Sequence, residues 1–330
     1  MSVNIQNKKI AIIGAGISGL ILANRLSKVA DVSVFEKSRG IGGRMTTRRA
    51  GDHHFDHGAQ FFTAKSDVFK EFCEEVEQQG IIESWNPNYA LIKGEEVILK
   101  GKLSDEKKHF VAKPQMNSLC KYLARNLNVK LNQKIESVQL HDKKWLLKCG
   151  DEEFGDFDYL ILAIPSHQAV DLVPESFKYF DLISKVKMLG CFSLMIGLKE
   201  KPELEFEAAS LRESIISWVS LNSSKPERPN EVALLVNSSN QWAETVIEDD
   251  LEQVKDQMMC QLAKIINIEP GNITYNSIHR WKYANADFRE GEQSLFDEKL
   301  GLGICGDWLI SGKVESAFLS GLDLSKKLLG

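Results

Sequence analysis

The chain has 330 residues, a length that suits two domains or one large one, and its 43% hydrophobic and 26% charged residues are typical of globular proteins. A formal net charge of -5 gives little electrostatic support for nucleic-acid binding. No apolar run reaches the ~18 residues that a membrane-spanning helix needs, and the first residues carry no apolar signal region. Neither nucleic acid nor membrane is therefore expected as a partner.

The six cysteines form no CxxC pair and show no metal-ligand spacing. We therefore expect no metal site and a reduced set of thiols, as in a cytoplasmic protein.

The N-terminal half predicts a strand, a helix and a second strand over 9–13, 17–29 and 32–35, which is a βαβ unit and implies a parallel sheet. Further along, amphipathic spacing predicts helices over 67–79 and 115–126. Short apolar runs predict strands over 129–132, 135–140, 145–149 and 159–164.

The C-terminal half changes character. Four runs, at 191–198, 215–221, 232–237 and 273–281, are typical of strands in an antiparallel sheet, and 223–230 is a polar turn between two of them. One long helix is predicted over 242–266, with its acidic run as solvated surface. A last strand over 302–305 and a last helix over 314–329 complete the pattern.

The segment GAGISG fits the dinucleotide-binding fingerprint G-x-G-x-x-G between a predicted strand and helix. Gly14 permits the tight turn, Gly16 lets backbone N–H groups approach a pyrophosphate, and Gly19 lets the helix pack closely on the strand. Glu36 lies 20 residues beyond Gly16, where a carboxylate can bind ribose hydroxyls. Strand, helix and acid together predict a nucleotide site.

A second match to the same pattern, residues 301–306, tests how much the glycines alone mean. Asp307 and Trp308 follow it instead of an apolar helix, and no acid ends a strand about twenty residues later. One fingerprint instead of two argues against reductases that bind FAD and NAD(P)H on paired Rossmann domains.

Residues 40–44, GIGGR, follow Glu36 closely, and here the chain resembles the amine-oxidase branch of the glutathione-reductase-type FAD fold. Gly42 and Gly43 would let the backbone pass close to FAD, and Arg44 could donate to phosphate oxygens. Arg48 and Arg49 could contact a phosphate-bearing substrate or could simply be exposed.

Five further segments make the resemblance closer: GGRMTTRR, DHGAQFF at 56–62, PQM at 114–116, RWKYA at 280–284, and the stretch from GDW at 306 to 321. Together they resemble the renalase family, particularly bacterial renalases. The resemblance runs from about residue 8 to the C-terminus, although the middle third carries few motifs.

The resemblance implies non-covalently bound FAD and a set of residues that bind it. Gly58, Ala59, Gln60 and Phe61 would lie against the isoalloxazine ring, and Ile135 would contact the adenine through its backbone. A helix beginning at Val314 would point at the N1–C2=O edge and stabilise negative charge there. The full set is Gly14, Gly16, Ser18, Gly19, Glu36, Lys37, Gly42, Gly43, Arg44, Gly58, Ala59, Gln60, Phe61, Ile135, Gly306, Asp307, Val314 and Glu315.

Several other residues have two interpretations. His57 is a candidate acid or base, although a lone histidine beside glycines more often packs or forms hydrogen bonds. Cys305 could attach a flavin, but in a strand it suits a small buried hydrophobe. Trp281 and Trp308 could line a substrate pocket or belong to the core.

The resemblance further implies an oxidase that converts the 2- or 6-dihydro isomers of NAD(P)H to NAD(P)+, passing hydride to flavin N5 and reducing O2 to hydrogen peroxide. The dihydropyridine nitrogen itself drives hydride departure, so no catalytic residue is assigned. The alternatives are a flavin amine oxidase or dehydrogenase acting on a small amine, and an FAD-binding protein without catalysis.

The expected fold is α/β. A Rossmann-type FAD-binding domain of residues 1–66, 107–165 and 300–330 would carry an inserted α+β substrate domain of residues 67–106 and 166–299 with an antiparallel sheet.

Overall fold

The structure is a computed structural model that describes residues 4–104, 106–287 and 289–330. Its contacts separate two compact units. Unit 1 consists of Met1–Met45, Leu119–Met188 and Ala286–Gly330, and unit 2 consists of Thr46–Ser118 and Leu189–Asn285.

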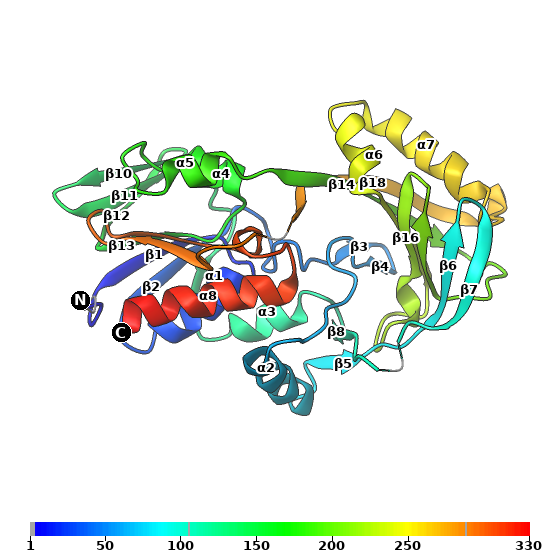
Figure 1. Cartoon of the computed structure of the whole chain (residues 1–330), viewed down its shortest axis with the longest axis horizontal. Coiled ribbons are helices and arrows are strands. Elements are labelled where there is room, and N and C mark those ends of the chain that lie inside the picture. The colour runs from blue at the N-terminus through cyan, green and yellow to red at the C-terminus, as the bar shows by residue number, and fades with distance from the viewer. Residues whose placement is uncertain (1–3, 105, 288) are drawn as a thin grey trace. The chain divides into compact units, whose positions relative to one another are not determined.

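Unit 1 is built on a six-stranded sheet (Figure 1). The strand order is β19 (Ser294–Asp297), β20 (Leu302–Cys305), β13 (Tyr159–Leu162), β1 (Lys9–Ile13), β2 (Asp31–Phe35) and β9 (Asn128–Lys130). All neighbours pair in parallel except β19 and β20. Because the central strands are buried on both faces, they are almost continuously apolar, as the sequence analysis expects of a parallel sheet.

Helices α1 (Ile17–Leu26) and α8 (Val314–Leu329) pack side by side against this sheet (Figure 1). Their approach is close, since a Cβ on Gly321 would meet the backbone oxygen of Ser18. A three-stranded antiparallel sheet of β10 (Ser137–His141), β11 (Lys144–Cys149) and β12 (Glu152–Phe157) also contacts the main strands. Unit 1 further contains α3 (Ser118–Leu123), α4 (Ser166–Val170), α5 (Phe180–Ser184) and the 3-10 helix η3 (Asp307–Leu309).

Unit 2 is built on a seven-stranded sheet. Its order is β18 (Ile273–Ala286), β14 (Met188–Leu198), β17 (Val232–Ser238), β16 (Ile216–Leu221), β15 (Ala208–Arg212), β6 (Asn88–Lys93) and β7 (Glu96–Lys102). The sheet contains the antiparallel pairs that the sequence predicts, but β15 and β6 pair in parallel, so it is mixed.

The two faces of this sheet are covered differently, as the alternation along β14 shows. Phe192, Leu194 and Ile196 point into a core that includes residues of α6 (Asn240–Thr245) and α7 (Leu251–Ala263). Met195 points to the other face, where Phe55 packs. That residue comes from the hairpin of β3 (Arg48–Ala50) and β4 (His53–Phe55). The remaining elements of unit 2 are α2 (Asp67–Gln78), β5 (Ile82–Ser84), β8 (Phe110–Ala112), η1 (Asn222–Ser224) and η2 (Pro270–Asn272).

The prediction of one long helix over 242–266 is wrong. The chain instead forms α6 and α7, and the break between them falls on the acidic run. The Asp250 side chain accepts hydrogen bonds from the backbone N–H groups of Glu252 and Gln253, which makes it the N-cap of α7. A residue that the sequence places on a solvated helix face therefore starts a new helix.

The predicted helix over 115–126 is reduced to α3, which begins at Ser118. The backbone before it is used elsewhere. The Met116 N–H donates to Thr47 Oγ1 and to the Asp56 carboxylate, and the Gln115 N–H donates to Ser118 Oγ. Side chains of unit 2 thus take the N–H groups that a longer helix would bring to its first turn.

The compact units also differ from the predicted domains. Residues 46–66 and 107–118, which the prediction assigns to the FAD domain, pack in unit 2, because β4 packs on the seven-stranded sheet and β8 pairs with β5. Residues 166–188 and 286–299 pack in unit 1, where β19 extends the six-stranded sheet.

All six cysteines lie among the described residues, and none forms a disulfide. None of the helices in the described residues is both long and apolar enough to span a membrane.

Candidate functional site

The first glycine turn of unit 1 has the shape that a nucleotide site needs. Gly14 joins β1 to α1 with a φ of 107°, and a Cβ there would lie 2.5 Å from the Ala163 oxygen. A Cβ on Gly19 would meet the Gly14 oxygen, so the helix lies directly against the turn. Gly16, by contrast, has nothing within 4 Å of an ideal Cβ. The turn is closed on the protein side and open above Gly16, as the approach of a phosphate requires.

Glu36 lies at the end of β2 and is buried. One carboxylate oxygen accepts the Ala15 N–H at 2.9 Å, and the other accepts the Ser38 N–H at 2.8 Å. The acid is therefore tied to the glycine turn and to the segment that follows β2. A carboxylate oxygen carries more than one lone pair, so this placement leaves it able to accept ribose hydroxyls as well.

The second glycine segment returns to the same turn. The Gly42 N–H donates to the Ala15 oxygen at 3.1 Å, and a Cβ on Gly43 would lie 3.5 Å from the Gly16 Cα. Both glycines have positive φ, at 129° and 55°. Only residues without a Cβ adopt this path at no steric cost, which is why a GG doublet stands here.

Arg44 and Asp307, both of which the resemblance assigns to FAD, form an ion pair with each other. Arg44 Nη1 donates to Asp307 Oδ2 at 2.8 Å, and Nη2 donates to Oδ1, so the contact is bidentate. The pair joins the loop after Gly43 to η3. The structure therefore brings the GIGGR and GDW motifs together.

Other predicted cofactor residues of unit 1 are placed as follows. Ile135 is buried before β10, Ser18 is buried in α1, and Val314 and Glu315 begin α8. Lys37 is exposed and donates to Gln168 Oε1 at 3.2 Å, and the Gly306 N–H donates to Ser320 Oγ at 2.9 Å.

Two residues with alternative interpretations also lie in unit 1. Trp308 is fully buried, and its indole N–H donates to the Ile164 oxygen at 3.0 Å, so it packs in the core of unit 1. Cys305 is buried in β20, and burial raises the pKa of its thiol to about 12. It is therefore the small buried hydrophobe that the sequence favours.

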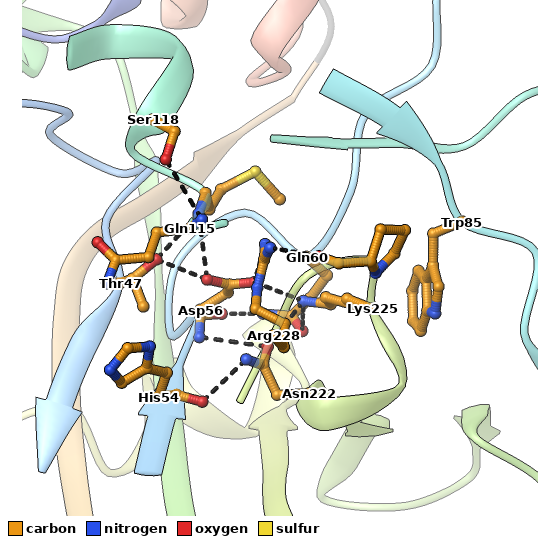
Figure 2. A network of polar contacts seen from close by, with 12 residues as sticks. Thr47, His54, Asp56, Gln60, Trp85, Gln115, Ser118, Asn222, Lys225 and Arg228 are labelled. Atoms are coloured by element: carbon orange, nitrogen blue, oxygen red, sulfur yellow. Dashed lines mark hydrogen bonds and ion pairs between the residues drawn. The ribbon is translucent and has the colours of Figure 1, made fainter. Parts of the chain in front are cut away.

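Unit 2 holds a buried polar cluster around Asp56 that the sequence does not reveal (Figure 2). Asp56 Oδ2 accepts Lys225 Nζ at 3.1 Å and Arg228 Nε and Nη2 at 3.1 and 2.8 Å. Its Oδ1 accepts Thr47 Oγ1 at 2.6 Å and the Met116 N–H at 3.3 Å. All three charged side chains are 0% exposed. We call Asp56, Lys225 and Arg228 the buried charge cluster.

The Gln60 side chain is turned into the same cluster. Its Nε2 donates to the Asp56 oxygen and, at 3.0 Å, to the Gly58 oxygen. Its Oε1 accepts Ser220 Oγ at 3.1 Å and Lys225 Nζ at 3.5 Å. Both N–H bonds and both lone pairs of the amide are thus in use. The Gln60 side chain thus closes the turn 56–60 through two of its backbone oxygens.

Four of the five segments that carry the family resemblance contribute residues to this region of unit 2. Thr47 comes from GGRMTTRR, Asp56 and Gln60 from DHGAQFF, and Met116 from PQM. Trp281 of RWKYA donates its indole N–H to the His57 oxygen at 2.8 Å. Segments far apart in sequence therefore support one short turn.

Lys225 and Arg228 are the residues that the sequence analysis misses, because it treats 223–230 as a polar turn. The turn contains Pro226 and Pro229 and inserts both cations into unit 2. The sequence contains one indication of this arrangement. Asp56 lies within an apolar motif, a buried carboxylate needs a counter-charge, and a rigid proline-containing turn can supply one.

The pKa values of Asp56 and Lys225 are both lowered in the cluster, which favours the charged form of the carboxyl group and the neutral form of the amine. Burial alone would raise the pKa of Asp56, but Lys225, Arg228 and the Thr47 hydrogen bond lower it to about 2. Burial and the neighbouring Arg228 lower the pKa of Lys225 to about 8, although Asp56 opposes the shift. Asp56 is therefore ionised at neutral pH, and Lys225 is the member whose proton is most easily lost.

His57 belongs to an aromatic cluster next to the turn. Its ring stacks on Trp281 with centroids 5.3 Å apart and meets His279 edge-on at 5.0 Å. Burial, with the neighbouring His279 and Arg48, lowers the pKa of His57 to about 3, and burial with Arg48 lowers that of His279 to about 4. Both imidazoles are neutral at pH 7. Ser193 and Trp281 donate to the His57 backbone oxygen, so packing and hydrogen bonding account for this residue.

Phe61 extends the aromatic surface on the other side of the turn. Its ring meets His109 edge-on at 4.7 Å and lies 5.6 Å from the ring of Trp218. The buried indole N–H of Trp218 has no hydrogen-bond partner among the described residues. Gly58–Phe61, which the resemblance assigns to the isoalloxazine ring, all lie in unit 2.

These observations first define a class. A parallel sheet with a glycine turn closed by Gly14 and Gly19, a buried Glu36 and a returning GG segment fits the dinucleotide part of FAD. The description "NAD(P)-binding Rossmann-like domain" matches residues 12–76, and "Flavin containing amine oxidoreductase" matches residues 105–329. The chain belongs to the family of flavin-containing amine oxidoreductases. The description of this family names a flavin cofactor and oxidoreductase chemistry.

Known relatives agree with the resemblance to renalases. Renalase of Mus musculus is 29% identical over 176 residues, which are 50% of this chain and 49% of the mouse protein. A 4,4'-diapophytoene desaturase of Staphylococcus aureus is 41% identical over 64 residues, 19% of this chain and 12% of that protein. The chain thus matches about half the length of the mouse relative and a smaller part of the bacterial one.

Two solved structures share the fold along nearly the whole chain. A putative protoporphyrinogen oxidase from Exiguobacterium sp. 255-15 superposes with a TM-score of 0.76 at 12% identity, covering 98% of this chain and 100% of that one. Cyclohexylamine oxidase from Brevibacterium oxydans superposes with a TM-score of 0.73 at 13% identity, covering 98% and 99%. At these identities the likeness concerns the fold alone.

Proposed function

We propose that the protein is a renalase-like oxidase that converts the 2- and 6-dihydro isomers of NAD(P)H to NAD(P)+ and reduces O2 to hydrogen peroxide. When bound, FAD supplies the redox chemistry, taking hydride at N5 and passing two electrons to O2. The balance is one dihydronicotinamide, one O2 and one proton giving one nicotinamide cation and one hydrogen peroxide. The protein's task is to bind, orient and exclude water.

The observation that carries this proposal is that two imidazoles and one carboxylate beside the turn 56–61 each keep one protonation state around pH 7. His57 and His279 are neutral, and the Asp56 carboxylate accepts five hydrogen bonds and stays ionised. None of the three is poised to exchange a proton near pH 7. A substrate whose own ring nitrogen drives hydride departure suits such surroundings, since it needs no acid or base.

Arg48 supports an anionic substrate. It is half-buried on β3, and no ion pair or hydrogen bond to its guanidinium occurs within the described part of the chain. It is close enough to His57 and His279 to lower the pKa of each. A cation held without a counter-charge beside aromatic rings suits a phosphate-bearing ligand such as a dinucleotide.

Anaerobic mixing tests the proposal against amine oxidation. FAD-loaded protein is mixed separately with the 2-dihydro isomer, the 6-dihydro isomer and a panel of amines, and flavin bleaching is followed. We expect both isomers to bleach the flavin, and admission of air to restore the oxidised spectrum with peroxide. Bleaching by an amine but by neither isomer would replace the proposal with amine oxidation, and no bleaching by any reductant would favour an FAD-binding protein without catalysis.

A further inference from the structure

The buried charge cluster contains one more positive charge than negative charge. Within the described part of the chain, Asp56 is the one carboxylate paired with these cations, and Lys225 and Arg228 both donate to its Oδ2 (Figure 2). Burying a charge is costly, and a second cation is not needed to neutralise Asp56. The extra cation calls for an explanation other than charge balance.

The two cations make different contacts. Arg228 donates to Asp56 and to the Pro226 oxygen within its own turn. Lys225 donates to Asp56, to Asn222 Oδ1 at 3.0 Å and to Gln60 Oε1. Its ammonium group also lies 5.4 Å from the centre of the Trp85 ring. Of the two cations, Lys225 is thus the one that contacts the Gln60 side chain.

This contact acts together with two backbone oxygens, which can only accept, to set how the Gln60 amide is turned. An ammonium group can only donate, so it requires the amide oxygen to face it and not the amide nitrogen. The NH2 group is then directed to the Asp56 and Gly58 oxygens, where it closes the turn. Ser220 could accept or donate through its hydroxyl and would not fix the orientation alone.

We propose that Lys225 is a positioning residue for the cofactor: its ammonium group orients the Gln60 amide, and that amide holds the backbone of the turn 56–60 in the form presented to the isoalloxazine ring. The proposal rests on FAD as the cofactor of the proposed function and on the position of Gly58–Phe61 against the flavin that the resemblance implies. It does not depend on which substrate the enzyme oxidises.

A double-mutant cycle tests the route through Gln60. Lys225→Met removes the ammonium group but keeps an unbranched chain, and Gln60→Leu removes the amide. The dissociation constant for FAD and the flavin reduction potential are measured for each single variant and for the double variant. We expect each single change to weaken FAD binding about tenfold, and the double variant to be no weaker than the single ones.

Lys100→Met is the matched control, because Lys100 is an exposed lysine of unit 2 paired with Glu205 outside the cluster. It should leave both quantities unchanged. Additive losses, about a hundredfold in the double variant, would show that Lys225 acts independently of Gln60 and would overturn the proposal. So would unchanged FAD binding and potential in folded Lys225→Met protein.

A pH series gives a readout that simple loss of packing would not. Asp56 and Arg228 are the charged groups that face Lys225, and both stay charged around pH 8, where Lys225 loses its proton. Wild-type FAD affinity should therefore fall through a transition near pH 8 that is absent in Lys225→Arg, which keeps the charge. The same transition in both proteins would contradict the proposal.

Should Lys225→Met fail to fold, Ser220→Ala replaces it in the cycle. It removes the second partner of Gln60 Oε1 and leaves the charges in place. We expect FAD binding to weaken about threefold in Ser220→Ala and not to weaken further when Gln60→Leu is also present. Additive effects would overturn the proposal, and all these measurements omit substrate, so their outcome is separate from that of the isomer experiment.

Discussion

The two units prepare their ligand-facing surfaces in different ways. Unit 1 uses backbone shape: Gly14, Gly16 and Gly19 form the turn, Glu36 is tied to it, and Gly42–Gly43 returns beside it. Unit 2 uses side chains, because the turn 56–60 is held by Lys225, Gln60 and their partners from distant segments. A site shaped by the backbone is disrupted when side-chain atoms are added to its glycines, whereas a site held by side chains is disrupted when those side chains are removed.

Removing the Asp56 carboxylate from the buried charge cluster should have the largest effect on stability. Asp56→Ala leaves two buried cations without a counter-charge, so the free energy of unfolding should fall by about 4 kcal/mol. Urea titration of the FAD-loaded protein measures it. Asp67→Ala, which breaks an exposed pair with Lys70, is the control and should change nothing measurable. If the Asp56→Ala protein were as stable as the wild type, Asp56 would not be the required counter-charge of Lys225 and Arg228.

Adding one methyl group at either of two positions in the glycine turn of unit 1 distinguishes an effect on protein stability from an effect on FAD binding. Gly14→Ala should lower the free energy of unfolding by about 3 kcal/mol, since its Cβ would press on the Ala163 oxygen at a φ of 107°. Gly16→Ala has free space around its Cβ and should leave stability of the FAD-free protein unchanged, while FAD binding weakens about tenfold. Calorimetry without FAD and fluorescence titration with it make the comparison. Equal losses of stability in both variants would mean that the turn is not open above Gly16.

Acid should destabilise unit 2 through its histidines. The folded-state pKa of His57, about 3, is below the ordinary value of 6.5, so the unfolded chain binds the proton first as pH falls. The stability is complete above pH 6.5 and decreases below it, by about 2 kcal/mol at pH 5 from His57 alone. Unfolding curves at several pH values should show this slope, and His57→Phe should flatten it. An unchanged slope in that variant would place the titration elsewhere.

The smallest expected effect concerns Arg48. If it binds a substrate phosphate, Arg48→Ala should raise KM for the dihydronicotinamide isomers about fivefold with kcat unchanged, because the contact is equal in ground and transition states. Arg49→Ala is the matched control, since Arg49 is the exposed neighbour on the same strand. A fall in kcat with KM constant would indicate a role in the turn 56–61 instead.

The sequence predicts the glycine turn of unit 1 better than it predicts the buried charge cluster of unit 2. The glycines and Glu36 are readable because local backbone geometry dictates their type and spacing. Asp56 and Gln60 stand in a recognisable motif, but their partners Lys225 and Arg228 lie more than 160 residues away in an unremarkable polar turn. No local rule links them, because only the tertiary fold brings a buried carboxylate to its counter-charges.

Local rules also failed where a side chain competed for the backbone. Asp250 caps a new helix inside the predicted span 242–266, because it accepts the Glu252 N–H that a continuous helix would pair with a backbone oxygen. The apolar spacing there fits a continuous helix, and the carboxylate outweighs it by offering a better partner for the N–H group.

The close contact between α1 and α8 bears on how the chain is made. Gly321 lies against Ser18, and β20 pairs with β13, so the sheet and helix layers of unit 1 are complete once residues 302–329 have left the ribosome. Residues 46–285 contain every segment of unit 2 and emerge earlier. The helix that follows the glycine turn is therefore covered by α8 only after every segment of unit 2 has been synthesised.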